Sequence, residues 1–229
     1  MVCPPPQPSR RAPQGIVFDF DGVLVNSEPL HLRATQEALA LRGLDMSEEE
    51  YYQRYVGFDD VTMFVELARD RGEIWCSDDL QELVAAKALR FEALERSVTP
   101  LVAGAAACVR RMADLAPIAI ASGARREEIE RMLGRAGLRP LFSAIVAAGD
   151  TPSGKPAPDP YAEAAARLRA QPARTIAIED TAAGLASAKA AGLRCIGITT
   201  TFRADKLQLA DVIVGSLDEV TAELVSSLV

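Results

Sequence analysis

Six short runs of the chain are almost entirely apolar and rich in isoleucine, valine and alanine. They do not alternate with polar residues, which is typical of strands buried on both faces of a parallel sheet. Because helical periodicity separates most of them, the pattern predicts an α/β fold with a doubly wound, mostly parallel sheet. The predicted strands are Ile16–Phe20, Ile118–Ala121, Ala144–Ala148, Thr175–Asp180, Cys195–Thr199 and Val212–Gly215.

The long interval between the first two predicted strands has helical periodicity throughout. A helix is expected to end at Gly43, Ser47 with Glu50 is typical of a capping box, and residues 78–95 are amphipathic. We therefore predict a Rossmann-like core of residues 15–28 and 98–229 with an inserted helical cap, residues 29–97. An insertion at this point would sit over the carboxyl ends of the strands, where such sheets bind ligands, and is placed as a lid.

Composition narrows the protein class. Residues 1–14 are proline-rich and polar, which predicts a disordered tail and not a secretory signal. No apolar run is long enough to cross a membrane, so we expect a cytoplasmic protein without a membrane partner. The four cysteines are scattered, which indicates reduced thiols. A formal net charge of −7 argues against a nucleic-acid partner, and the oligomeric state stays open.

Carboxylates stand in pairs at the ends of two predicted strands. Asp19 and Asp21 close the first strand, where repulsion and lost solvation are unfavourable unless a metal ion or a proton transfer uses them. Glu179 and Asp180 close the fourth strand and need a cation or strong donors. The alternatives are an Asx turn at the first pair and helix capping by Asp180 at the second, which leaves Glu179 unexplained.

Two further loops that follow predicted strands carry groups able to hold an anion. Ser122 and Gly123 offer a hydroxyl and backbone N–H groups, and the alternative is a plain helix N-cap. Lys155 lies in a rigid glycine–proline turn, which indicates a point charge aimed at one place, and the alternative is an exposed loop lysine. Because the carboxyl ends of parallel strands meet at one edge of a sheet, we expect all four loops to converge there.

The order of these motifs is more specific than any one of them. The segments "DFDGVLVNSE", "ASG", "GKPAPDPY" and "IEDTAAGLASAKAAG" resemble the four motifs of the haloacid-dehalogenase-like hydrolase superfamily. The resemblance covers residues 16–216. The place of the helical insertion is similar to that in the branch with β-phosphoglucomutase and phosphoglycolate-type phosphatases.

The resemblance implies a role for each motif residue. Asp19 matches the nucleophile that forms an aspartyl-phosphate, and Asp21 matches the general acid and base. Ser122, with Gly123 beside it, and Lys155 match the groups that hold the phosphate. Glu179 and Asp180 match the acidic pair that binds Mg²⁺ together with Asp19 and the backbone carbonyl of Asp21.

Two further residues are candidates for contact with the substrate. His31, the single histidine, lies in "NSEPLH", where relatives carry a histidine near the second aspartate, although a helix-surface residue is the alternative. Arg126, with Arg125, closely follows Ser122 and could reach a substrate anion, although both are also typical of a solvated helix face.

These expectations point to a Mg²⁺-dependent phosphatase that acts on a small phosphorylated metabolite. The alternatives are a phosphomutase and a non-catalytic phosphate-binding regulator. The resemblance disfavours a dehalogenase, because dehalogenases of this superfamily lack the second aspartate. It also disfavours a phosphonate-cleaving enzyme, because those relatives use a cap lysine for a Schiff base and the single cap lysine here, Lys87, lies deep in a helix. A mutase also needs a basic cap group for its second phosphate, whereas Asp59 and Asp60 follow Gly57 and Phe58 at the matching place. Arg54 or Arg90 could also fold into that place. The substrate itself is not indicated.

Overall fold

The computed structural model describes residues 12–56, 58–98 and 100–229, and the chain divides into two compact units. One unit comprises Met1–Asn26 with Pro100–Val229, and the other comprises Ser27–Thr99. Of the tail predicted for residues 1–14, residues 1–11 lie outside the described residues. Gln14 belongs to the larger unit, where its N–H donates to the carbonyl oxygen of Arg174 at 2.8 Å.

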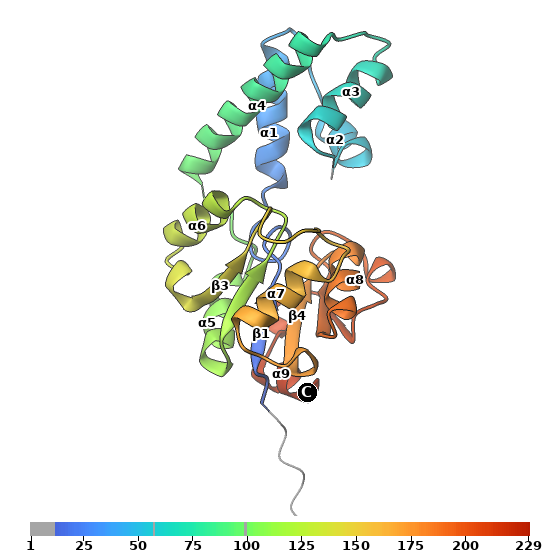
Figure 1. Ribbon diagram of the computed structural model, residues 1–229. Coiled ribbons are helices and arrows are strands. Elements are labelled where there is room, and N and C mark those ends of the chain that lie inside the picture. The colour runs from blue at the N-terminus through green and yellow to red at the C-terminus, as the bar shows by residue number, and fades with distance from the viewer. Residues whose placement is uncertain (1–11, 57, 99) are drawn as a thin grey trace, which may run out of the picture. The chain divides into compact units, whose positions relative to one another are not determined.

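A six-stranded sheet forms the centre of the larger unit (Figure 1). All neighbouring strands are parallel and follow the order β3-β2-β1-β4-β5-β6, so the predicted doubly wound sheet is confirmed. The strands β1 and β4 end at Phe18 and Glu179, before the predicted ends, because the polar residues beyond turn into loops. The strands are β1 (Gly15–Phe18), β2 (Ile118–Ala121), β3 (Phe142–Val146), β4 (Thr175–Glu179), β5 (Arg194–Ile198) and β6 (Val212–Val214).

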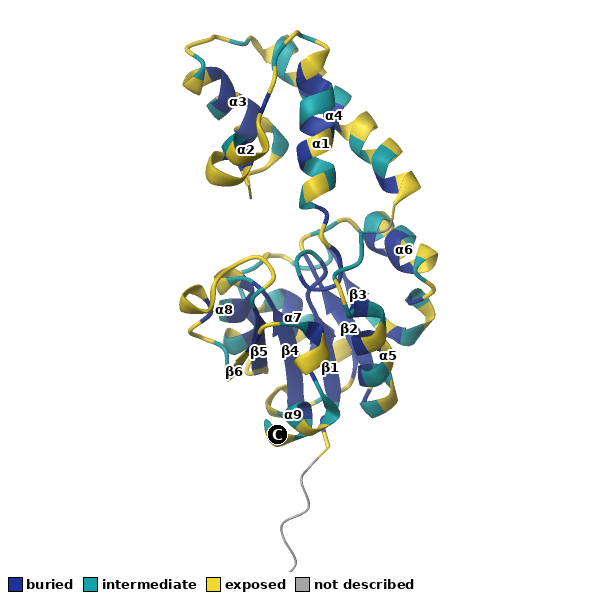
Figure 2. Ribbon diagram, turned by 180° about the vertical axis from the view of Figure 1, so that it is seen from behind, coloured by how far each residue is buried: buried dark blue, intermediate teal, exposed yellow. Residues whose placement is uncertain are grey.

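Helices cover both faces of the sheet, which explains the unbroken apolar strands. Ile16 and Phe18 pack in one cluster with residues of α5, α6 and α9, whereas Val17 packs in a second cluster with residues of α7 and α8. The alternation follows from the two-residue period of a strand, and the central strands β1, β2 and β4 are buried at every residue (Figure 2). The α-helices of this unit are α5 (Ala105–Leu115), α6 (Arg126–Arg135), α7 (Asp159–Arg167), α8 (Ala182–Ala190) and α9 (Ala222–Ser227).

The smaller unit is helical, as the sequence predicts for this interval. Ser47 caps α2 by accepting a hydrogen bond from Glu50 N at 3.0 Å, whereas the Glu50 carboxylate pairs with Arg71 instead of completing the capping box. Its helices are α1 (Glu28–Ala40), α2 (Glu48–Arg54), α3 (Asp60–Asp70) and α4 (Ser77–Ser97). They enclose a separate apolar core of Leu32, Leu39, Met46, Tyr51, Tyr55, Met63, Phe64, Leu67 and Leu83.

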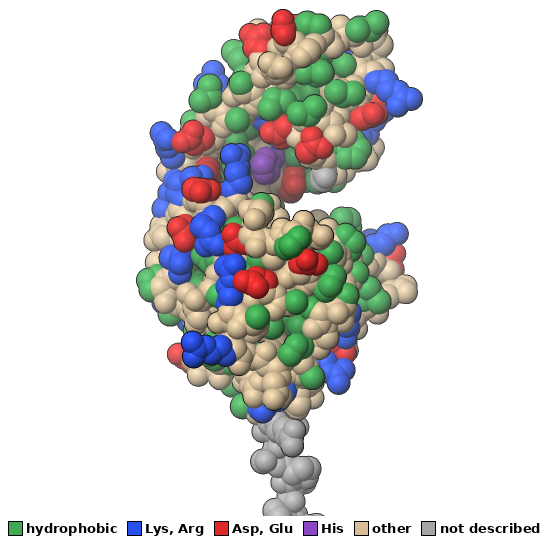
Figure 3. Space-filling model, viewed as in Figure 1, with side chains coloured by type: hydrophobic (Ala, Val, Ile, Leu, Met, Phe, Trp, Pro, Cys, Tyr) green, Lys and Arg blue, Asp and Glu red, His purple; other side chains and the backbone are tan. Residues whose placement is uncertain are grey.

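The surface mixes charges of both signs. On the face drawn in Figure 3, acidic and basic side chains are interspersed. Of the helices formed by residues 12–56, 58–98 and 100–229, none combines the length and the apolar character needed to cross a membrane.

Candidate active site

Three buried carboxylates meet where β1 and β4 end. Asp19 directly follows β1, and its backbone N–H donates to the carbonyl oxygen of Ile178 in β4 at 3.0 Å. Glu179 ends β4 and Asp180 follows it, and both are buried. One carboxylate oxygen from each of Asp19, Glu179 and Asp180 lies within 4.8 Å of the others. The parallel pairing of β1 with β4 therefore brings together the acids that the sequence singled out.

Lys155 supplies a positive charge to this cluster. Its Nζ lies 2.8 Å from Asp19 Oδ1 and 2.6 Å from Glu179 Oε1, so it is not the exposed loop lysine of the alternative interpretation. Burial alone would lower the pKa of Lys155, but the two carboxylates outweigh burial and raise it. The lysine therefore stays charged beside the acids.

Glu179 has a complete set of donors. Besides Lys155, Tyr161 donates its hydroxyl to Oε1 at 3.1 Å, while Thr181 donates its N–H and its hydroxyl to Oε2, each at 2.9 Å. Burial alone would raise the pKa of Glu179, but Lys155 and these hydrogen bonds lower it. Helix α8 approaches so closely that a β-carbon at Gly184 would lie 1.6 Å from Glu179 Oε1.

Asp180 carries the feature that best fits a metal ion. Its Oδ1 is buried and has no hydrogen-bond partner, which is costly for a carboxylate oxygen. Burial first, and then Glu179, raise the pKa of Asp180 to about 7 against the lowering effect of a hydrogen bond from Thr201. Helix capping by Asp180 is wrong, because Thr181 is the N-cap of α8 and accepts from Gly184 N. A buried carboxylate oxygen without a hydrogen-bond partner, close to the carboxylate oxygens of Asp19 and Glu179, suits a hard cation such as Mg²⁺.

Burial also decides the electrostatics of Asp19. Desolvation, together with Glu179 and Asp180, raises the pKa of Asp19 well above its ordinary value, although Lys155 opposes the shift. Asp21 is half-buried in the turn that follows β1. The next residue, Gly22, has φ +77°, and a β-carbon there would lie 1.9 Å from Asp180 Oδ2. Only glycine fits where this turn approaches the second acidic pair.

Ser122, Gly123 and Lys155 line one pocket of ≈ 350 Å³. Ser122 follows β2, and its hydroxyl accepts from Ala124 N at 3.0 Å. It is not the N-cap of α6, because that position belongs to Arg125. The pocket thus brings together the predicted phosphate-holding residues, and its remaining lining residues are Ala147, Ala148, Gly149, Thr151, Gly154 and Pro160.

The two candidate substrate residues have internal partners. Arg126 opens α6 and pairs with Asp150 at 2.5 Å, and it donates to the Ile145 carbonyl oxygen at 3.0 Å. His31 belongs to the smaller unit, where its ring stacks on Phe91 with centroids 4.1 Å apart. Burial, followed by nearby Lys87, lowers the pKa of His31 to about 4, although Asp60 opposes the shift. The imidazole is therefore neutral at pH 7.

Two residues that contact the acidic cluster, Tyr161 and Thr201, are not indicated by the sequence. Tyr161 lies in the quoted segment "GKPAPDPY", but a tyrosine at the start of an apolar helix is typical of core packing. Thr201 follows β5, where an apolar run gives no hint of contact with Asp180. Tyr161 reaches Glu179 and Thr201 reaches Asp180 from other parts of the chain, and nothing in the sequence near either residue indicates such a contact.

Comparisons with known proteins agree with this geometry. Hexitol phosphatase B of Escherichia coli (strain K12) is 32% identical over 212 residues, which cover 90% of this chain and 94% of that protein. Fructose-1-phosphate phosphatase YqaB of the same strain is 30% identical over 187 residues, covering 80% of this chain and 95% of that protein. The crystal structure of a HAD family hydrolase from Deinococcus radiodurans R1 with bound phosphate and sodium is 31% identical and has a TM-score of 0.78, covering 96% of this chain and 99% of that one.

The family profile of haloacid dehalogenase-like hydrolases matches residues 13–192, which include all four motifs of the site. The resemblance stated from the sequence is thereby confirmed. The chain belongs to the haloacid dehalogenase-like hydrolase family.

Proposed function

We propose that the protein is a Mg²⁺-dependent phosphatase that hydrolyses a small phosphorylated metabolite, such as a sugar phosphate, through an aspartyl-phosphate. The observation that carries the proposal is the placement of Lys155 Nζ, 2.8 Å from Asp19 Oδ1 in a pocket shared with Ser122. A carboxylate attacks a phosphate dianion only when positive charge neutralises the approach. The named substrates of the phosphatase relatives support the same class of substrate.

Two displacements complete the proposed reaction. Asp19 Oδ forms a bond to phosphorus while the bond from phosphorus to the ester oxygen breaks, and Asp21 gives its proton to the leaving alcohol. Asp21 then takes a proton from water, whose oxygen attacks phosphorus and releases inorganic phosphate from Asp19. Ser122, Gly123 and Lys155 hold the phosphoryl oxygens.

Asp19, Glu179, Asp180 and the backbone carbonyl of Asp21 would hold Mg²⁺. The ion supplies positive charge against the phosphoryl oxygens. The orphaned Oδ1 of Asp180 supports this assignment. Burial first, and then the neighbouring acids, raise the pKa of Asp19 and of Asp180, and a bound cation would oppose both effects.

Contacts within the smaller unit favour hydrolysis over mutase chemistry. Gly57 lies outside the described residues. Of the two acids that follow it, Asp59 caps α3 by accepting from Val61 N and Thr62 N, and Asp60 pairs with Lys87. Of the two alternative sources of positive charge, Arg54 and Arg90, the first pairs with Asp70 at 2.6 Å. These acids and bases are engaged with one another and do not form a spare cationic site for a second phosphate.

The test is a screen of phosphorylated metabolites in the presence of Mg²⁺. Hexitol phosphates, fructose 1-phosphate and β-glucose 1-phosphate with a trace of its bisphosphate are suitable substrates. Inorganic phosphate and isomerised sugar phosphate are both followed. We expect phosphate release from at least one polyol or sugar monophosphate. Glucose 6-phosphate formation that outpaces phosphate release would favour the mutase, and no turnover of any compound would favour a non-catalytic binder.

A further inference from the structure

The loop that carries Lys155 runs from the end of β3 at Val146 to the start of α7 at Asp159 and consists of turns and bends. Its far end is held by α8, because Ser187 donates its hydroxyl to the Ala157 carbonyl oxygen at 2.5 Å. Its near end meets the loop after β2, where Ala148 N donates to the Ala124 carbonyl oxygen at 2.9 Å. The position of Lys155 therefore depends on anchors at both ends of its loop.

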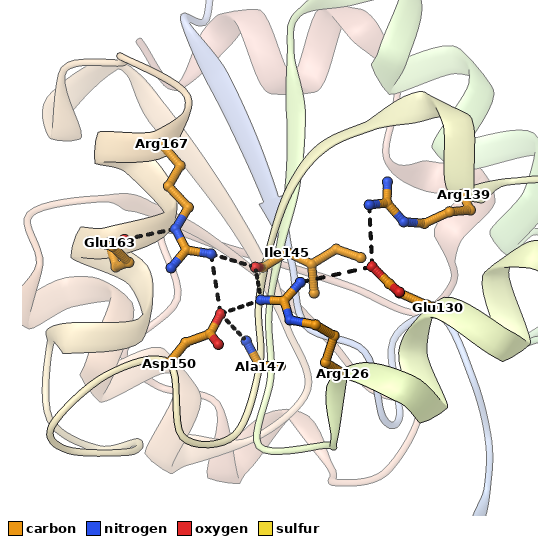
Figure 4. A network of polar contacts seen from close by, with 8 residues as sticks. All are labelled: Arg126, Glu130, Arg139, Ile145, Ala147, Asp150, Glu163 and Arg167. Atoms are coloured by element: carbon orange, nitrogen blue, oxygen red, sulfur yellow. Dashed lines mark hydrogen bonds and ion pairs between the residues drawn. The ribbon is translucent and has the colours of Figure 1, made fainter.

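Asp150 adds charged contacts at the end of the Lys155 loop that follows β3. Its Oδ2 accepts from Ala147 N at 3.2 Å, from Arg126 of α6 at 2.5 Å and from Arg167 of α7 at 3.1 Å (Figure 4). Both guanidinium groups also donate to the Ile145 carbonyl oxygen, at 3.0 and 2.8 Å. Two helices are thus tied to the end of β3 and to the loop that follows it, through the Ile145 carbonyl oxygen and the Asp150 carboxylate.

Outer acids hold the two arginines in place. Glu163 accepts from Arg167 Nε at 2.7 Å, and Glu130 lies 3.9 Å from Arg126 and 3.4 Å from Arg139 (Figure 4). Partial burial alone would raise the pKa of Asp150, but the bond from Ala147 N and the two guanidinium groups lower it below its ordinary value. The carboxylate is therefore ionised at neutral pH, when the anchor is fully formed.

We propose that Asp150, clamped by Arg126 and Arg167, is a positioning residue that fixes the Lys155 loop and so sets the affinity of the pocket for phosphate. The inference rests on the proposed function, because it assumes that Lys155 and Ser122 hold a phosphoryl group. The loop supplies Gly149, Thr151 and Gly154 to the pocket as well as Lys155. Arg126 then acts through Asp150 and does not itself contact the substrate.

The chain offers a matched control at the opposite edge of the sheet. Asp211 accepts from Cys195 N at 2.6 Å and pairs with Lys189 and Arg194, and the latter contact is 3.3 Å. Its side chain is 19% exposed, against 20% for Asp150. Cys195 lies near the start of β5, away from the strand ends that form the site. Asp150→Asn and Asp211→Asn therefore remove similar charges, but only the first touches the Lys155 loop.

The experiment measures the binding of inorganic phosphate by titration calorimetry with Mg²⁺ present, together with kcat, KM and thermal unfolding. We expect both variants to lower the unfolding temperature. Asp150→Asn should weaken phosphate binding about tenfold, because a charge-assisted hydrogen bond such as that from Lys155 weakens when its donor is displaced. Asp211→Asn should leave phosphate binding within twofold of the wild type.

Further variants separate positioning from direct contact with the phosphate. In the double variant Arg126→Gln/Asp150→Asn, the losses in affinity should be no greater than in Asp150→Asn alone, since both residues serve one anchor. Should Asp150→Asn fail to fold, Arg167→Gln removes one guanidinium and should weaken phosphate binding in the same direction. Unchanged phosphate affinity in folded Asp150→Asn or Arg167→Gln, or equal losses in Asp211→Asn, would overturn the clamp. Wild-type protein that binds no phosphate would contradict the proposed function, and the clamp with it.

Discussion

At the scale of single residues, Asp19 combines the proposed chemistry with unfavourable electrostatics. Its pKa is raised by burial and by its acidic neighbours, so its charge opposes folding when no metal is bound. Lys155 keeps Glu179 as a partner when the charge at position 19 is removed. We expect Asp19→Asn to abolish phosphate release while the metal-free protein unfolds at the same temperature or higher. Clear turnover by the purified, folded variant would contradict the assignment of the nucleophile.

His31 gives a second residue-scale prediction, in the smaller unit. Its pKa falls from 6.5 to about 4 on folding, so the unfolded chain binds the proton more tightly. The contribution of neutral His31 to the free energy of unfolding is therefore complete above about pH 6.5 and declines as the pH falls towards 4. The loss over this range is about 3 kcal/mol at most. Asp60 and Lys87 are its charged neighbours. We expect His31→Phe, which can still stack on Phe91, to lose less stability over this range than the wild type.

The measurement can follow this unit alone. Trp75, the single tryptophan, packs on its apolar core, so denaturation followed by tryptophan fluorescence reports the smaller unit. An equal decline of the free energy of unfolding with pH in the two proteins would rule out His31 as the cause.

At the scale of elements, the contact between α8 and β4 leaves no room for a side chain. A β-carbon at Gly184 would overlap the Glu179 carboxylate, which Lys155, Tyr161 and Thr181 hold from other directions. We expect Gly184→Ala to destabilise the protein by about 1–3 kcal/mol, as overpacking does. It should also weaken Mg²⁺ binding, because the displaced carboxylate belongs to the proposed metal site.

Gly134 in α6 is the matched control, because a β-carbon there has nothing within 4 Å. Gly134→Ala should stabilise the protein by about 1 kcal/mol through helix propensity alone. The comparison uses urea denaturation and Mg²⁺ titration of both variants. Equal stabilisation by the two substitutions would show that the Glu179 side chain can move away from the new β-carbon without loss of stability. The close approach of α8 to Glu179 would then not require glycine at position 184.

Elements and motif residues differ in how far the sequence predicts their surroundings. Strands such as Ile118–Ala121 are predictable because burial on both faces demands an unbroken apolar run. Asp19, Lys155 and Glu179 are predictable because each ends such a strand or lies in the loop after one. The partners of Asp150 are not, because Arg126 and Arg167 meet it from two different helices, and nothing in the sequence near Asp150 records that approach. The sequence offers Arg126 either as a substrate contact or as part of a solvated helix face, and in neither case does it indicate Asp150 as a partner.

At the scale of the whole molecule, we expect the acidic site to couple metal binding to global stability. Without metal, Asp180 binds a proton more tightly in the folded protein, with a pKa of about 7 against 3.8, than in the unfolded chain. The free energy of unfolding should therefore fall as the pH rises through this range. A ligand that binds the folded state alone adds RT ln(1 + [L]/Kd), or about 2.7 kcal/mol at a hundredfold excess over Kd.

At the proposed site, Mg²⁺ would have to displace the proton from Asp180 in order to bind, so its stabilising effect should grow with pH. We expect Mg²⁺ to raise the unfolding temperature of the larger unit more at about pH 8 than at about pH 5, when compared with chelator-treated protein. Ca²⁺ should restore little activity, because Mg²⁺ requires octahedral geometry at about 2.1 Å and Ca²⁺ accepts longer bonds and more ligands. Asp180→Asn loses one proposed ligand and one displaceable proton, so the stability that Mg²⁺ adds should be smaller than in the wild type at both pH values. A Mg²⁺ effect of the same size at both pH values in the wild type would place the ion elsewhere than on Asp180.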